Sequence, residues 1–171
     1  MEPKQEIKHL EYTLGVVNYW IDKVDAKVSI SLGLFPLISA IMKYINSTYY
    51  QRAINLAWLY KMMDILCAVL LVSSITYFIL ALKPNLKSSG KKETKKYPIY
   101  YGDICRLGLD DYKSLIIRAD ENDYADELMN EIHCNSDICY KKMVRFKKGI
   151  ILSIISICLE IGCLTIMVFS S

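Results

Sequence analysis

The stretch GIILSIISICLEIGCLTIMVF, residues 149–169, has the length and apolar composition of a membrane-spanning helix but carries one carboxylate, Glu160. A helix needs about 20 apolar residues to cross the hydrocarbon core of a bilayer. Placing a charged side chain near the centre of such a helix costs roughly 2.5 kcal/mol or more on insertion scales. Glu160 is therefore a tolerated defect, a residue that joins helices, or a functional group.

Two further apolar blocks of similar length lie at residues 28–45 and 65–82. The first contains Pro36 and, near its end, Lys43, whereas the second contains no charged residue. The block at 28–45 lies too far from the first residue to be a cleaved signal peptide. The three blocks predict an all-α membrane protein with three transmembrane helices.

The basic residues predict how the chain is oriented in the membrane. Of the 21 lysine and arginine residues, 14 lie within residues 83–148, whereas residues 46–64 contain only Arg52 and Lys61. Segments rich in lysine and arginine stay in the cytoplasm. We therefore expect the N-terminus and residues 83–148 to be cytoplasmic and the C-terminus to lie outside. Anionic lipid headgroups explain the basic clusters at the span ends, and an anionic ligand is the alternative.

The N-terminal residues 1–27 carry an apolar pattern that runs directly into the first span. Its members alternate in steps of three and four, which is the a/d seam of a heptad repeat. The pattern predicts one long helix from about Pro3 to Ile45, and this seam either packs within the chain or mediates self-association. The seam residues are Ile7, Leu10, Leu14, Val17, Ile21, Val24 and Val28.

Two polar segments connect the spans. Residues 46–64 are rich in Tyr and Trp, which are typical of membrane interfaces, and we expect them to form a loop outside the membrane, with a short amphipathic helix on the outer surface as the alternative. Residues 83–96 are rich in Gly, Ser and Lys, which predicts a flexible basic linker. The remaining soluble part is too small to bury a large core alone, so we expect it to pack against the seam or against other subunits.

Residues 97–148 form the main soluble segment. Asp110 is a suitable N-cap for a short helix that ends near Arg118. From Asn122 no Pro or Gly interrupts the sequence until Gly149, which predicts one continuous helix that runs on through the third span. The expected inward face of this helix consists of Tyr124, Leu128, Ile132, Asn135, Cys139, Met143 and Phe146.

The sequence contains no recognisable catalytic constellation. Phosphate-binding loops, dinucleotide-type glycine patterns, nucleophile elbows and zinc-protease motifs are absent, and neither His9 nor His133 belongs to a triad pattern. We therefore expect a protein that is not an enzyme and that needs no cofactor or metal. The six cysteines lie in spans or in the inferred cytoplasm, where reduced thiols are the default.

Three motifs resemble, in order, those of the transmembrane effectors of Pycsar anti-phage systems. They are DKVDAKVSISLG at 22–33, YPIYYGDI at 97–104 and IHCNSDICYKKMVRFKKG at 132–149. Asp25 and Lys27 match an Asp-x-Lys-Ala pattern at the start of the first span, with Val28 in place of the common Ala, and they would form a structural pair or an ion vestibule. The resemblance covers nearly the whole chain.

The resemblance implies a bacterial inner-membrane effector that responds to a nucleotide made by a partner cyclase or nucleotidyltransferase and compromises the membrane. Related channels of Hailong-type systems are instead held shut by a nucleotide product. Residues 97–148 would then sense the nucleotide, with aromatic rings for the base and cations for phosphate. In the alternative, the tyrosines form a small core and the basic residues only set topology. The candidates are Tyr100, Tyr101, Arg106, Asn135, Ser136, Lys141 and Arg145.

In the third span Ser153, Ser156 and Glu160 share one face at helical spacing. Such a polar stripe either joins helices or lines water. Lys43 lies near the end of its block whereas Glu160 lies near mid-depth, so a salt bridge between them is not expected. In a symmetric oligomer Glu160 would recur as a ring of carboxylates, a device for cation selection.

The leading hypothesis is a homo-oligomeric ion channel or pore, with a tetramer favoured, that a nucleotide gates. The alternative is a membrane scaffold whose heptad seam recruits a partner protein.

Overall fold

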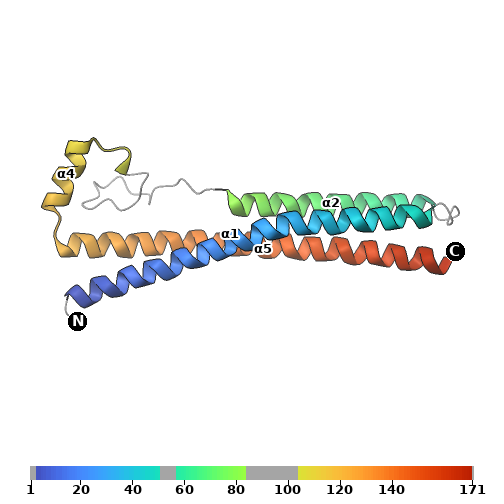
Figure 1. Cartoon of the computed structure of the whole chain (residues 1–171), viewed down its shortest axis with the longest axis horizontal. Helices are drawn as coiled ribbons and strands as arrows, with labels where there is room; N and C mark the ends of the chain where they lie inside the picture. Colours follow the sequence, from blue (N-terminus) through green and yellow to red (C-terminus); the bar gives the residue numbers. More distant parts are fainter. Residues whose placement is uncertain (1–2, 51–56, 84–103, 171) are drawn as a thin grey trace. The chain divides into compact units, whose positions relative to one another are not determined.

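The computed structural model describes residues 3–50, 57–83 and 104–170. These residues are almost entirely helical and contain no strand, which confirms the predicted all-α class. Three helices are long and apolar enough to cross a membrane, as predicted. The helices are α1 (Pro3–Tyr50), α2 (Ala57–Leu82), α4 (Leu109–Arg118) and α5 (Glu121–Ser170) (Figure 1).

The two long helices are continuous. Helix α1 has 48 residues and includes Pro36, and α5 has 50 residues. At the start of α5 the Asp120 carboxylate accepts a hydrogen bond from the Asp123 backbone N–H at 2.7 Å, and the Asp123 carboxylate accepts one from the Asp120 N–H at 3.5 Å. This reciprocal capping satisfies backbone donors that a helix start leaves unpaired. The predicted continuity from residue 122 through the third span is confirmed.

The predicted N-cap of the short helix is wrong. Helix α4 begins at Leu109, and Gly108 occupies the cap position without a side-chain hydrogen bond. Asp110 and Asp111 instead lie in the first helical turn. Carboxylates are favourable there because the N-terminal end of a helix carries partial positive charge. The predicted end at Arg118 is correct.

The predicted loop at 46–64 is too long. Helix α1 continues to Tyr50 and α2 begins at Ala57, so only residues 51–56 lie between them, outside the described residues. No Pro or Gly interrupts residues 46–50 or 57–64, and extending an existing helix costs little. All but the first residue of the expected linker at 83–96 also lies outside the described residues.

The chain divides into two compact units. Unit 1 comprises Met1–Lys23 and Pro84–Lys141, and unit 2 comprises Val24–Lys83 and Lys142–Ser171. In unit 1, α1 and α5 are joined by a hydrogen bond from the Tyr124 hydroxyl to the Glu11 carboxylate at 2.9 Å. The seam residues of this unit, from Ile7 to Ile21, are half-buried.

In unit 2, helices α1, α2 and α5 lie side by side around an apolar core (Figure 1). The seam residues Val24 and Val28 are fully buried there with Phe78 of α2, so this end of the heptad seam packs within the chain. A Cβ atom added at Gly149 would lie only 2.6 Å from the Phe78 ring. Glycine at this position lets α5 approach α2 closely.

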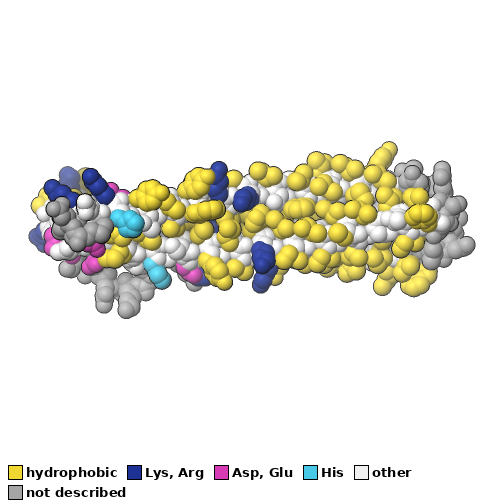
Figure 2. Space-filling model, turned by 90° about the horizontal axis from the view of Figure 1, so that it is seen from below, with side chains coloured by type: hydrophobic (Ala, Val, Ile, Leu, Met, Phe, Trp, Pro, Cys, Tyr) yellow, Lys and Arg dark blue, Asp and Glu magenta, His cyan; other side chains and the backbone are white. Residues whose placement is uncertain are grey.

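The outward side chains of unit 2 are largely apolar. Figure 2 shows them in yellow over the visible face of the half that leads to the C-terminus. A surface of this kind fits the hydrocarbon core of a bilayer, where the apolar face is covered by lipid. Examples with roughly half or more of their surface exposed are Ile30, Leu37, Ile41, Val69, Val72 and Ile154.

Candidate functional site

Polar side chains occupy the interior of unit 2 at several levels. Each is at most 9% exposed, although the outward side chains of the unit are largely apolar. Buried polar groups of this kind normally pair across helices, because an unpaired group is costly without water. The residues are Ser31, Ser39, Ser74, Lys142, Ser153, Ser156 and Glu160.

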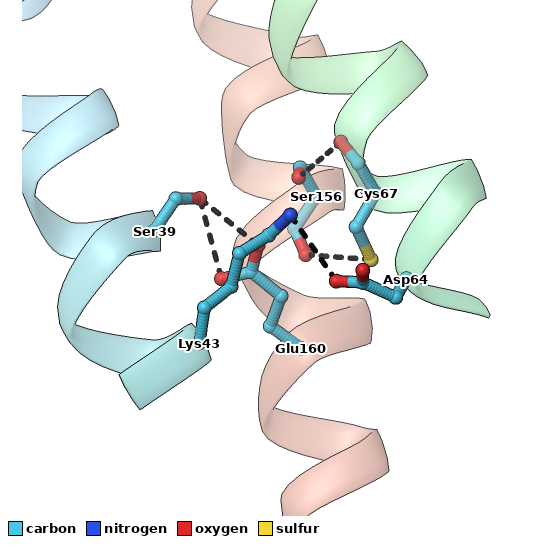
Figure 3. A network of polar contacts seen from close by, with 6 residues as sticks. All are labelled: Ser39, Lys43, Asp64, Cys67, Ser156 and Glu160. Carbon is cyan, nitrogen blue, oxygen red and sulfur yellow. Dashed lines mark hydrogen bonds and ion pairs between the residues drawn. The ribbon is translucent and has the colours of Figure 1, made fainter. Parts of the chain in front are cut away.

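Glu160 lies on α5 and is 3% exposed, and Ser39 of α1, opposite it, is 1% exposed. The Ser39 Oγ atom lies 3.0 Å from one carboxylate oxygen and 3.2 Å from the other (Figure 3). A hydroxyl has one proton, so both distances describe one shared hydrogen bond. No second donor to this carboxylate is found in the described part of the chain, although a carboxylate can accept about four.

Two further pairs of residues make polar contacts near Glu160. Together with the Ser39–Glu160 contact, they join each pair of the helices α1, α2 and α5 (Figure 3). The Ser156 hydroxyl of α5 donates to the Cys67 carbonyl of α2 at 3.1 Å, and the Cys67 thiol donates back to the Ser156 carbonyl at 3.7 Å. Lys43 of α1 forms an ion pair of 3.2 Å with Asp64 of α2. We call the six residues Ser39, Lys43, Asp64, Cys67, Ser156 and Glu160 the Glu160 network.

Ser153 lies two turns before Glu160 and is also fully buried. Its hydroxyl lies 2.6 Å from that of Ser74 on α2, which donates to the Gly149 carbonyl at 2.7 Å. The three predicted pore residues, Ser153, Ser156 and Glu160, thus all contact α1 or α2 inside one chain. Their lining of a pore stays a prediction.

Asp25 of α1 forms an ion pair with Lys142 of α5, not with Lys27. The Lys142 Nζ atom lies 2.7 and 2.6 Å from the two carboxylate oxygens. The Lys142 side chain is 10% exposed and that of Asp25 is 34% exposed. Such a charge-assisted contact is stronger than a neutral hydrogen bond. Lys27 itself is exposed.

Lys142 was not identified from the sequence, although the spacing of residues along α5 could have indicated it. The buried row of α5 steps by four and three residues, as a heptad seam does. The expected inward face placed Met143 where the structure has Lys142, and Met143 is 39% exposed. The row consists of Lys142, Phe146, Gly149, Ser153, Ser156, Glu160 and Cys163, of which Phe146 is half-buried.

The predicted nucleotide-binding residues fall in different places. Tyr100 and Tyr101 lie outside the described residues. Arg106 is exposed ahead of α4, and Ser136 is exposed on α5. Asn135, half-buried beside it, donates to the Asn18 side chain of α1 at 3.0 Å.

The two remaining candidate cations already have partners within the chain. Lys141, which is exposed, pairs with Asp137 one turn earlier on α5. Arg145 belongs to unit 2, where its guanidinium donates to the Leu80 carbonyl at 2.8 Å. This contact satisfies a carbonyl at the end of α2. Nucleotide binding by all of these residues stays a prediction.

Comparison with known proteins gives the family. A model described as the Pycsar effector protein domain matches residues 9–169. The chain is 22% identical over 159 residues to the Pycsar effector protein GmPycTM of Gulbenkiania mobilis, covering 81% of each chain. No solved structure matches the chain significantly. The chain therefore belongs to the Pycsar effector family and is a membrane effector of anti-phage defence.

Proposed function

We propose that this protein is a homo-oligomeric channel of the bacterial inner membrane, gated by a nucleotide that a partner cyclase makes, and that its open state disrupts the membrane of infected cells. The observation that carries the proposal is Glu160, a carboxylate buried in a membrane-spanning part of α5. The proposal assigns the chain no catalytic step.

Glu160 supports a conducting role because joining helices does not require a carboxylate. Ser74 and Ser153 join α2 and α5 with neutral hydroxyls, at a far lower desolvation cost. Ionisable residues inside membrane spans face interiors or water-filled paths and mark routes for ions. Repeated around a symmetric assembly, Glu160 would favour cations.

Helix α5 supports gating because it carries both kinds of candidate residue. Asn135, Ser136 and Lys141 precede Glu160 on the same uninterrupted helix. A ligand that displaces the first part of a continuous helix can shift or rotate the part that follows. The family supports a nucleotide signal from a partner cyclase.

The scaffold alternative receives less support. It requires the heptad seam to be free for a partner protein, but Val24 and Val28 at its end are fully buried within the chain and the seam residues from Ile7 to Ile21 are half-buried. A stoichiometric protein partner recovered with the full-length chain, together with a lack of conductance, would favour the scaffold.

The test is ion conductance of the purified full-length protein in planar bilayers, with the 3′,5′-cyclic nucleotides of A, G, C and U as probes. We expect one of them to change the conductance, and we expect Glu160→Gln to lower the preference for K⁺ over Cl⁻ by about tenfold, a loss of about 1.4 kcal/mol. Unchanged selectivity in Glu160→Gln would exclude the carboxylate ring. The absence of any conductance would exclude the channel.

A further inference from the structure

We propose that Ser39 holds Glu160 inside unit 2 in the closed channel, and that opening separates α1 from α5 at this contact. The inference rests on the proposed channel function and deepens it by naming the residue that keeps the channel closed. Ser39 is a positioning residue here, because it acts through Glu160 and need not touch the permeating ion.

Glu160 is shielded from water in the structure. A carboxylate that selects cations must be open to water and ions when the channel conducts. In the structure Glu160 is 3% exposed and contacts Ser39 of α1 in its own chain. The conformation described here is therefore closed at Glu160, whichever way the nucleotide acts.

The Ser39 hydroxyl provides the contact that keeps Glu160 in place. The Ser39 hydroxyl, at 3.0 and 3.2 Å from the two carboxylate oxygens, is the donor to Glu160 found among the described residues. Its removal leaves a buried carboxylate without that hydrogen bond, which is costly in a site that excludes water. The cost falls only on the closed state, because an open state supplies water to the carboxylate. The equilibrium must then move towards the open state.

The other contacts of the Glu160 network differ from this one in kind. Ser156 and Cys67 exchange neutral hydrogen bonds with backbone carbonyls. Lys43 and Asp64 join α1 to α2 and are 41% and 63% exposed, so this pair does not hold the buried carboxyl group. Among the described residues, the Ser39 contact is the one hydrogen bond that joins α1 to the buried carboxyl group of Glu160.

The experiment is ion flux from liposomes that contain the full-length protein with Ser39→Ala, measured in the condition in which the wild type is closed. We expect the closed-state flux to rise about tenfold, because the buried carboxyl group loses its hydrogen-bond partner, a loss of about 1.4 kcal/mol. We also expect unchanged cation selectivity and a retained response to the cyclic nucleotides.

The matched control is Ser29→Ala on the same helix. The Ser29 hydroxyl donates to the Asp25 carbonyl of its own helix at 2.9 Å, and its removal should leave the closed-state flux unchanged. A second variant, Glu160→Gln, keeps an acceptor for Ser39 and should stay closed while its selectivity changes.

The outcomes separate this inference from the channel proposal. Closed-state flux in Ser39→Ala equal to that in Ser29→Ala overturns the role of Ser39, even if Glu160→Gln confirms the ring. Leakage that comes with loss of the helical circular-dichroism signal or of the nucleotide response also counts against it, because the variant has then misfolded. A wild type without flux in any condition overturns the channel itself.

Discussion

Two carboxylates in unit 2 have opposite surroundings. Asp25 of α1 receives both its hydrogen bonds from the ammonium group of Lys142, at 2.6 and 2.7 Å. Glu160 of α5 is more deeply buried, yet its donor is the neutral hydroxyl of Ser39. Asp25 is matched by an opposite charge, whereas Glu160 has no cation in hydrogen-bond contact among the described residues.

The difference indicates that the two carboxylates serve different purposes. A matched pair at the interface of α1 and α5 specifies how these helices meet, and losing one partner leaves the other uncompensated. An unmatched carboxylate adds cost without an equivalent gain in stability. Its cost is explained if the group acts in a state other than the closed one. Stability measurements on substitutions at the two sites test this contrast.

The largest expected effect is that of Lys142→Met, which removes the charge and keeps much of the apolar stem. Asp25 then loses its partner in a partly buried site, and we expect the free energy of unfolding to fall by about 3 kcal/mol. Titration of the full-length protein in mixed micelles with increasing SDS measures this change.

Lys147→Met is the control for Lys142→Met. Lys147 is exposed on the same helix, and its substitution should change stability by no more than about 0.5 kcal/mol. Equal effects of the two substitutions would show that the Asp25–Lys142 pair contributes no specific stability, and the contrast with Glu160 would fail.

The arrangement of this pair shows where sequence reasoning reached its limit. The a/d spacing of Ile7 to Val28 and the uninterrupted run after Asn122 predicted two long helices, because helical periodicity is local information. The partners of Asp25 and Glu160 are set by how far one helix slides along another. Lys142 and Ser39 lie more than 100 residues away from them in sequence, and no local pattern records that register.

The errors at helix ends have a different cause. Aromatic residues in 46–64 suggested an interfacial loop, but aromatic side chains do not end a helix. Asp110 suggested a cap because Asp is a good N-cap, yet Asp is also favourable in the first turn, two or three positions after the cap residue. Amino-acid composition therefore distinguishes these positions poorly. Gly149 is a different case, because its role is visible only once the structure places the Phe78 ring beside it.

An intermediate effect is expected for Gly149→Ala, which tests the packing that positions the buried row of α5. The new Cβ atom would lie 2.6 and 2.8 Å from atoms of the Phe78 ring, inside the van der Waals contact distance. Overpacking at such a contact costs about 2 kcal/mol, and we expect the SDS titration to show this loss.

Gly162→Ala provides the matched control, because nothing lies within 4 Å of a Cβ atom at that position on the same helix. Alanine favours helix by up to about 1 kcal/mol, so Gly162→Ala should be neutral or stabilising. A combined Gly149→Ala and Phe78→Leu variant should recover part of the loss. A neutral Gly149→Ala would mean that the Phe78 ring can move aside.

Glu160→Gln should have the smallest effect on stability, and its result distinguishes Glu160 from Asp25 most directly. The glutamine amide has nearly the same shape, accepts the same hydrogen bond from Ser39 and brings no charge into the apolar interior. We expect the free energy of unfolding to change by less than about 1 kcal/mol, or to rise, because an amide costs no more to bury than a carboxyl group without a cationic partner. Asp25→Asn should instead be destabilising, because it leaves the buried ammonium group of Lys142 without a counter-charge.

If Glu160→Gln proved as destabilising as Asp25→Asn in the same SDS titration, Glu160 would hold the helices together as a charged group. The selectivity change would then have to be separated from a loss of structure, and the reason for assigning this carboxylate to the open state would disappear.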